Sequence, residues 1–217
     1  MNNRKSNKSI IFLATLGIYL GLAFAGATSQ VYSQDNPPAE IVVNARPLRD
    51  FREYAGYALR TREIDLATSF SVSFEGYLTD SAAFDVKRSK FVRSSGDNKS
   101  VEIAKQGIQA LGDSGLLQYL TGLGMDAVSI TVSQDNQIVS LNISSDAKTK
   151  ERAMTISSGL GVAIQIAKIQ SANYADKILL ENMKSGAAGS LLRIEISIPY
   201  DKVQKILLGG GVRSGND

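Results

Sequence analysis

The sequence of 217 residues contains no cysteine and no histidine. Without cysteine the chain can form neither disulfides nor thiolate nucleophiles and metal sites. Without histidine it lacks the commonest general base and the commonest metal ligand. A Ser-His-Asp triad and a histidine-bound zinc are therefore excluded. Carboxylate pairs, Ser-Lys dyads and oxygen-ligand calcium sites survive the exclusion, but no pattern in the chain predicts a metal site or a cofactor.

Basic charge is concentrated at the N-terminus. The chain has 24 basic and 21 acidic residues and an isoelectric point near 9.0. Arg4, Lys5 and Lys8 stand in the first 30 residues, which hold no acid, so the remainder has 21 residues of each sign. A region without net charge has no overall attraction for nucleic acid. We expect no nucleic-acid partner.

The N-terminus has the layout of a targeting segment. Residues 1–9 are polar and basic, residues 10–27 carry no charge, and small residues at 23–27 give cleavage sites after Ala25 or Ala27. The apolar run is also long enough to span a bilayer. Two interpretations stay open: a transmembrane helix anchoring a periplasm-facing protein in the inner membrane, or a cleaved signal that releases it into the periplasm or medium. Basic residues hold the N-terminus in the cytoplasm in either case.

A retained anchor would also present a face of small residues. Gly17, Gly21 and Ala25 are spaced four apart, so they lie on one side of a helix. Such a face lets two membrane helices approach closely. The sequence thus predicts a homodimer through these three residues if the segment is not cleaved.

The rest of the chain predicts one α+β domain at 47–208, after a linker at 28–46 and before a flexible tail at 209–217. Alternating apolar residues predict about five strands, and helical spacing predicts six helices. Strands with one apolar face form a mostly antiparallel sheet with helices packed on one face. The strands are expected at 70–78, 84–93, 128–132, 139–143 and 192–198, and the helices near 47–60, 97–112, 116–123, 149–168, 174–183 and 201–208.

The second predicted strand is locally basic and has an irregular apolar pattern, which indicates a bulge near Lys87-Arg88. One interpretation is a contact for an anionic ligand or a partner strand. The other is a solvated sheet edge, where lysine discourages unwanted pairing. The candidate partner-binding edge comprises Lys87, Arg88, Ser89, Lys90, Phe91 and Arg93.

Residues 68–111 resemble the C-terminal domain of the TonB/TolA group. The similar pattern is Phe70-Ser-Val-Ser-Phe74, a turn, Phe84–Val92, Ser94-Ser95-Gly96-Asp97, and a helix with Val101, Ala104 and Ile108 inward. The resemblance implies a periplasmic α+β domain that recruits a partner by adding a strand at a sheet edge. It does not imply proton-driven transduction, because the apolar segment lacks the histidine of the energy-transducing members.

Three functions follow, in order of preference. The first is a non-catalytic envelope module that binds an envelope protein by strand addition. The second is a small-ligand or lipid-binding domain with a cavity between sheet and helices. The third is a hydrolase of Ser-Lys or carboxylate type. A large apolar cavity would favour the second function, a long exposed strand edge without a cavity the first, and a Ser–Lys pair in a cleft the third.

Overall fold

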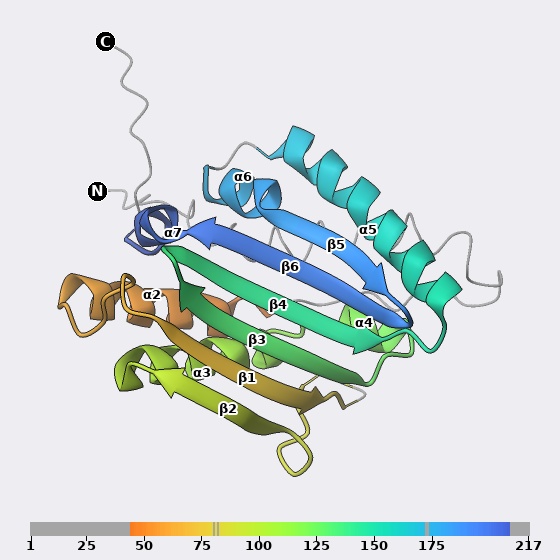
Figure 1. Cartoon of the computed structure of the whole chain (residues 1–217), viewed down its shortest axis with the longest axis horizontal. Helices are drawn as coiled ribbons and strands as arrows, with labels where there is room; N and C mark the ends of the chain where they lie inside the picture. The colour runs from red at the N-terminus through yellow and green to blue at the C-terminus, as the bar shows by residue number, and fades with distance from the viewer. Residues whose placement is uncertain (1–43, 80, 82, 172–173, 209–217) are drawn as a thin grey trace, which may run out of the picture.

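The computed structural model describes residues 44–208, except positions 80, 82 and 172–173 (Figure 1). Its centre is a six-stranded sheet in the order β2-β1-β3-β4-β6-β5, in which every neighbouring pair is antiparallel. The predicted α+β class is confirmed, with six strands in place of five. The strands are β1 Phe70–Tyr77, β2 Lys90–Gly96, β3 Ala127–Asp135, β4 Ile138–Asp146, β5 Met183–Ala188 and β6 Leu191–Pro199.

The helices form where the sequence has helical apolar spacing and a starting signal. Pro47 stands in the first turn of α2, where a missing amide costs nothing. Asp97 caps α3 by accepting from the Ser100 amide at 2.8 Å, and Thr149 caps α5 in the same way. The helices described are α2 Arg46–Arg60, α3 Asn98–Asp113, α4 Gln118–Gly122, α5 Lys150–Gln170, α6 Tyr174–Glu181 and α7 Tyr200–Leu207.

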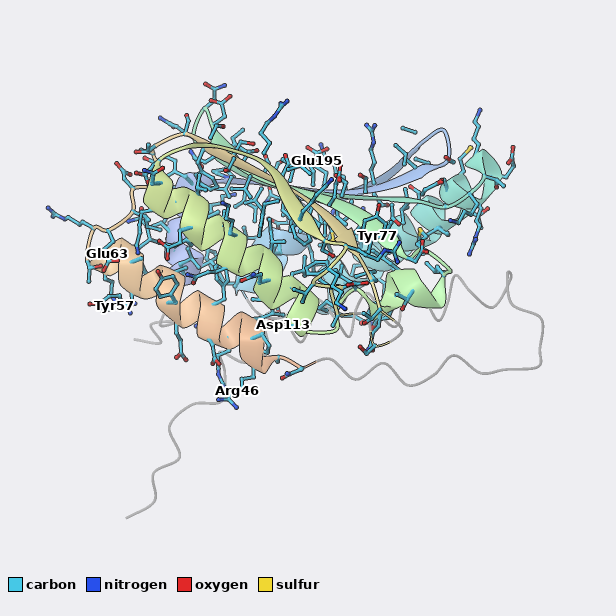
Figure 2. All side chains as sticks on the ribbon, turned by 90° about the horizontal axis from the view of Figure 1, so that it is seen from below. Arg46, Tyr57, Glu63, Tyr77, Asp113 and Glu195 are labelled. Atoms are coloured by element: carbon cyan, nitrogen blue, oxygen red, sulfur yellow. The ribbon has the colours of Figure 1, made fainter. Side chains whose placement is uncertain are left out.

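The two faces of the sheet differ sharply. Phe74 on β1 and Ile196 on β6 are buried, as their positions in the alternation predict. Their neighbours Ser73 and Ser197 point to the other face, where Glu195 also lies, on the side of the sheet away from α2 and α3 (Figure 2). One row across this open face is serine on five successive strands: Ser95, Ser71, Ser133, Ser140 and Ser197.

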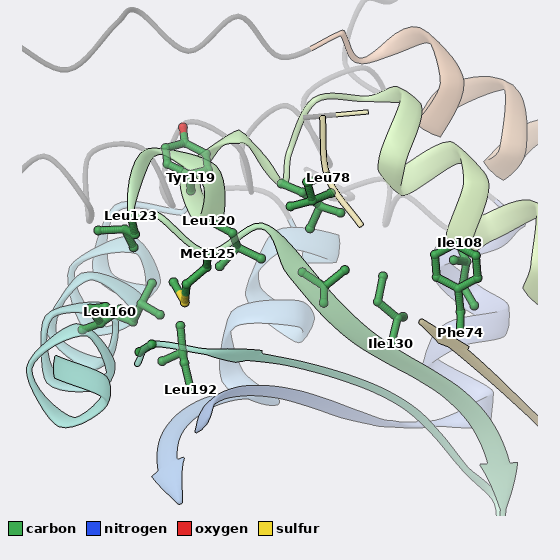
Figure 3. Close-up of a cluster of buried hydrophobic side chains, with 14 of the residues drawn as sticks. Phe74, Leu78, Ile108, Tyr119, Leu120, Leu123, Met125, Ile130, Leu160 and Leu192 are labelled. Carbon is green, nitrogen blue, oxygen red and sulfur yellow. The ribbon is translucent and has the colours of Figure 1, made fainter. Parts of the chain in front are cut away.

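The apolar face packs into several buried clusters that share half-buried residues such as Leu141 and Leu111, and Figure 3 shows one of these clusters. Phe74 contacts the rings of Phe84 and Phe91, with centroids 4.7 and 4.8 Å apart. Ile108 of α3 and Ile130 of β3 belong to the same buried cluster. The leucines of the predicted short helix at 116–123 are all buried, as expected. The described helices therefore share one face of the sheet.

The second strand is shorter than predicted. Residues 85–89 form a turn in which the Asp85 side chain accepts from the Lys87 amide and its carbonyl accepts from the Ser89 amide. Phe84 makes only an isolated bridge to Leu78 before that turn. The bulge predicted at Lys87-Arg88 is instead inside β2, where Ser73 pairs with Arg93 but Phe74 pairs with Phe91, so that Val92 is the extra residue.

β5 was missed because its sequence, Met-Lys-Ser-Gly-Ala-Ala, has no alternation of large apolar residues. α5 lies close to this strand at Ser185. Ser185 Oγ donates to the carbonyl of Ser157 at 2.9 Å, and a side-chain carbon at Gly161 would lie 3.6 Å from that same hydroxyl.

The transmembrane helix predicted at residues 10–27 is not supported. None of the helices described between residues 44 and 208 is long and apolar enough to cross a bilayer. The longest, α5, has charged residues in its first and last turns and buries one side against the domain. Residues 10–27 themselves lie outside the described residues, as do the small-residue face at Gly17, Gly21 and Ala25, most of the linker and the tail. We therefore do not propose a membrane span.

The sheet register gives a direct stability test. Phe74→Ala and Ile196→Ala should each lower the free energy of unfolding by about 2–5 kcal/mol, because each leaves a cavity in the core. Ser73→Ala and Ser197→Ala should cost well under about 1 kcal/mol, because both hydroxyls lie on the open face. Denaturant melts measure the free energy of unfolding of all four variants. Equal losses for the apolar-face and the open-face substitutions would contradict this register.

Candidate functional site

An apolar cavity of about 270 Å³ lies between one end of the sheet and three helices. It is found where β1 begins, β3 ends and β4 begins, with α2, α3 and α7 around it (Figure 1). The strands contribute Phe70, Val132, Val139 and Leu141. Because all four alternate toward the apolar face, the floor of the cavity is hydrocarbon.

The helices and one loop complete the walls. Leu48, Phe51 and Ala55 come from α2, and Val203 and Leu207 come from α7. The loop before β1 supplies Ile64 and Leu66. The longest stretch of wall is α3, which contributes Ser100, Ile103, Ala104, Gly107, Ile108 and Leu111. Ser100 is the only one of these described lining residues with a polar side chain.

Small residues explain why the space is not filled. Ala55, Ala104 and Gly107 line it, at positions where a leucine would occupy much of the volume. The glycine is required, because a side-chain carbon at Gly107 would come within 2.8 Å of the Phe51 ring. Gly56 is similarly needed, since such a carbon would lie 2.7 Å from the Leu207 carbonyl. These contacts fix the helix positions while leaving the cavity between them.

Two buried oxygen atoms at this end of the domain make no hydrogen bond of ordinary geometry. One is Ser100 Oγ, on a residue that is 4% exposed and lines the cavity. The other is Oε1 of Gln134, which is 1% exposed. Gln134 pairs with Phe70 on one side and Val139 on the other, both of which line the cavity. Buried polar atoms without partners are uncommon, because each costs about 1–3 kcal/mol.

Asp97 stands beside the first of these atoms. The Ser100 backbone amide lowers the pKa of the Asp97 carboxyl most, and the Ser100 hydroxyl adds to the shift although it makes no well-formed hydrogen bond. The carboxylate is therefore negatively charged at neutral pH. It places a fixed negative charge at the start of α3, next to Ser100 in the cavity wall.

The predicted partner-binding residues do not form one strand face. Lys87, Arg88 and Ser89 lie in the turn before β2, and only Lys90, Phe91 and Arg93 lie in the strand. β2 does occupy one end of the sheet order, with β1 as its only partner among the described strands.

Several of these side chains have intramolecular partners. The Arg88 guanidinium lies 4.1 Å from the centroid of the Tyr77 ring, and Lys90 Nζ is 3.6 Å from a Glu75 carboxylate oxygen. Phe91 faces the core. Lys87 and Arg93 are exposed. The basic stretch is thus partly neutralised within the domain.

The hydrolase alternative gains no support from the described part of the chain. No group of three or more acidic residues there could hold a metal ion. Two of the lysines there form ion pairs with carboxylates and not with a serine: Lys99 with Glu63 and Glu102, and Lys205 with Asp201.

No family model, no curated protein and no solved structure matches this chain. The resemblance of residues 68–111 to the TonB/TolA group accordingly stays a prediction. The candidate site rests on its own geometry.

Sequence patterns predicted the walls of the cavity but not the cavity. Ala55, Ala104, Ile108 and Leu111 fall on predicted apolar helix faces, which says that they point inward but not that space is left between them. Ser100 is one residue with a recognisable signal, because it is a polar residue on the inward side of a capped helix.

Proposed function

We propose that this protein is an exported domain that binds a small apolar ligand, such as an alkyl chain of a lipid, in the cavity between α2, α3, α7 and the sheet. The observation that carries the proposal is a space of about 270 Å³ whose lining residues are all apolar except Ser100. Small-molecule sites are concave, mostly apolar and have few polar groups, in cavities of about 300–1,000 Å³. At about 270 Å³ this cavity is slightly smaller than that range.

The volume limits the ligand. At ~30 Å³ for each water-sized group, the space holds a chain of roughly nine or ten carbon atoms. Each methylene removed from water contributes about 0.8 kcal/mol. A medium-length alkyl chain therefore fits in size and in chemistry, whereas a charged or strongly polar small molecule would lose its hydration without finding partners. Export through residues 1–27 stays a prediction, because they lie outside the described residues.

Filling the cavity tests this function. Ala104→Leu places a larger side chain in the space, so binding of the uncharged fluorescent probe N-phenylnaphthylamine to the full chain should weaken about tenfold or more, or 1.4 kcal/mol. Stability should change by less than about 1.5 kcal/mol, because the added carbons enter empty volume.

The matched control is Ala163→Leu, at a buried alanine of α5 that is not part of the cavity wall. This change should cost about 1–3 kcal/mol through overpacking and leave probe binding by the folded fraction unchanged. Undiminished probe binding by a folded Ala104→Leu protein would contradict the proposed function.

Strand addition at β2 is a second candidate function. Six of its seven residues are exposed, and Phe91 is the exception. An exposed edge strand offers unpaired amides and carbonyls to an extended segment of a partner. This edge, the locally basic stretch and the resemblance of residues 68–111 support an envelope protein as the partner.

Proline on this edge tests the second candidate. Amides of successive residues in an antiparallel strand point alternately to the two sides, so one of Arg93→Pro and Ser94→Pro removes an outward donor and leaves the β1 pairing intact. Circular dichroism identifies which variant stays folded. That variant should lose capture of partners from envelope extracts, and full capture by it would remove β2 as the docking edge.

A further inference from the structure

The end of the cavity at Ser100, called here the polar corner, restricts the chemistry of a ligand more than the hydrocarbon walls do. Ser100 Oγ lines the cavity, and Gln134 Oε1 lies in the row of the sheet between Phe70 and Val139, which also line it. Both residues are at the end of the sheet where β1 begins and where β2 gives way to α3. Ser100 Oγ therefore lies at this end of the cavity, whereas Gln134 is not one of the lining residues and only its strand neighbours line it.

Both oxygen atoms can accept a hydrogen bond. The amide oxygen of glutamine can only accept hydrogen bonds, and the oxygen of a serine hydroxyl accepts as well as donates. The Ser100 hydroxyl is close enough to Asp97 to affect its pKa, so a proton acceptor is already near it. What this corner lacks is a donor.

The charged groups near Ser100 decide which kind of hydrogen-bond donor could bind there. The Asp97 carboxylate accepts from the Ser100 amide at 2.8 Å and disfavours a second anion nearby. Lys99, which precedes Ser100 in the sequence, has its ammonium group 3.3 Å from a Glu102 carboxylate oxygen and 3.9 Å from a Glu63 carboxylate oxygen. No lining side chain carries a charge that could compensate a cationic headgroup or an anionic one, and an uncompensated buried charge is strongly unfavourable.

We propose that the ligand is a single-chain amphiphile with an uncharged headgroup that donates a hydrogen bond, such as an alcohol or a primary amide, and that Ser100 Oγ accepts that bond. This inference rests on the proposed function, because it requires the alkyl chain to occupy the cavity. The headgroup then lies at the end where β1 begins, and the chain extends along α3 toward Leu111. A carboxylate, an ether or an ester presents only acceptors, so none of them can donate to Ser100 Oγ.

Matched ligands separate the headgroup from the chain. Decanol, decyl methyl ether and decanoate have chains of equal length and differ in the headgroup, and displacement of N-phenylnaphthylamine from the full chain measures their affinities. Decanol should bind roughly 2- to 10-fold more tightly than the ether, the range for one net hydrogen bond, and decanoate should bind more weakly than decanol.

A variant assigns that preference to Ser100. Ser100→Ala should reduce the ratio of decanol to ether affinity toward one while leaving ether binding unchanged or stronger. It should stay folded, because it removes a buried hydroxyl that makes no ordinary hydrogen bond. Ser114→Ala is the control, since Ser114 is buried at the end of the same helix and donates to the Leu111 carbonyl at 2.6 Å. It should lower stability and leave the ratio unchanged.

The outcomes distinguish a failure of the headgroup assignment from a failure of the proposed function. Equal affinity for decanol and the ether, or tighter binding of decanoate, would overturn the headgroup assignment while the cavity function stands. A decanol preference that survives Ser100→Ala would place the headgroup elsewhere and overturn it too. Failure of all three ligands to displace the probe, or failure of the probe to bind, would overturn the proposed function itself.

Discussion

The structure depends on a sheet that is apolar on one face only. The open face is built from serine, threonine, asparagine and charged residues, including the serine row that ends at Ser197. All the described helices must therefore lie on the other face, which is the only one that gains from their burial. The cavity is a consequence of this arrangement, because α2, α3 and α7 converge over one end with small residues at Ala55, Ala104 and Gly107.

The polar atoms at that end extend the same physical account. A well-packed core would place a hydrocarbon side chain at Ser100 and would pair the amide of Gln134. Here both oxygens are buried without ordinary hydrogen bonds, beside a space that is large enough for an alkyl chain. A bound amphiphile with a donor group would fill the volume and give Ser100 Oγ a hydrogen-bond partner, so one ligand accounts for both the empty space and this unpaired oxygen.

The sequence was informative where periodicity decides the structure. Alternation placed Phe74 and Ile196 in the core, and capping at Asp97 located the start of α3. It failed at β5, whose sequence has no alternation of large apolar residues, and at residues 85–89, where the side chain of Asp85 stabilises a turn. The cavity could not be predicted at all, because periodicity tells which way Ala104 points but not the distance to the opposite wall.

If the cavity binds an alkyl chain, a crystal structure of the full chain grown with decanol should show continuous ligand density bounded by Leu48, Ile103 and Leu141. The ligand oxygen should lie within hydrogen-bond distance of Ser100 Oγ. A cavity closed by rearranged side chains, with decanol bound only on the outer surface, would show that the cavity is not the binding site.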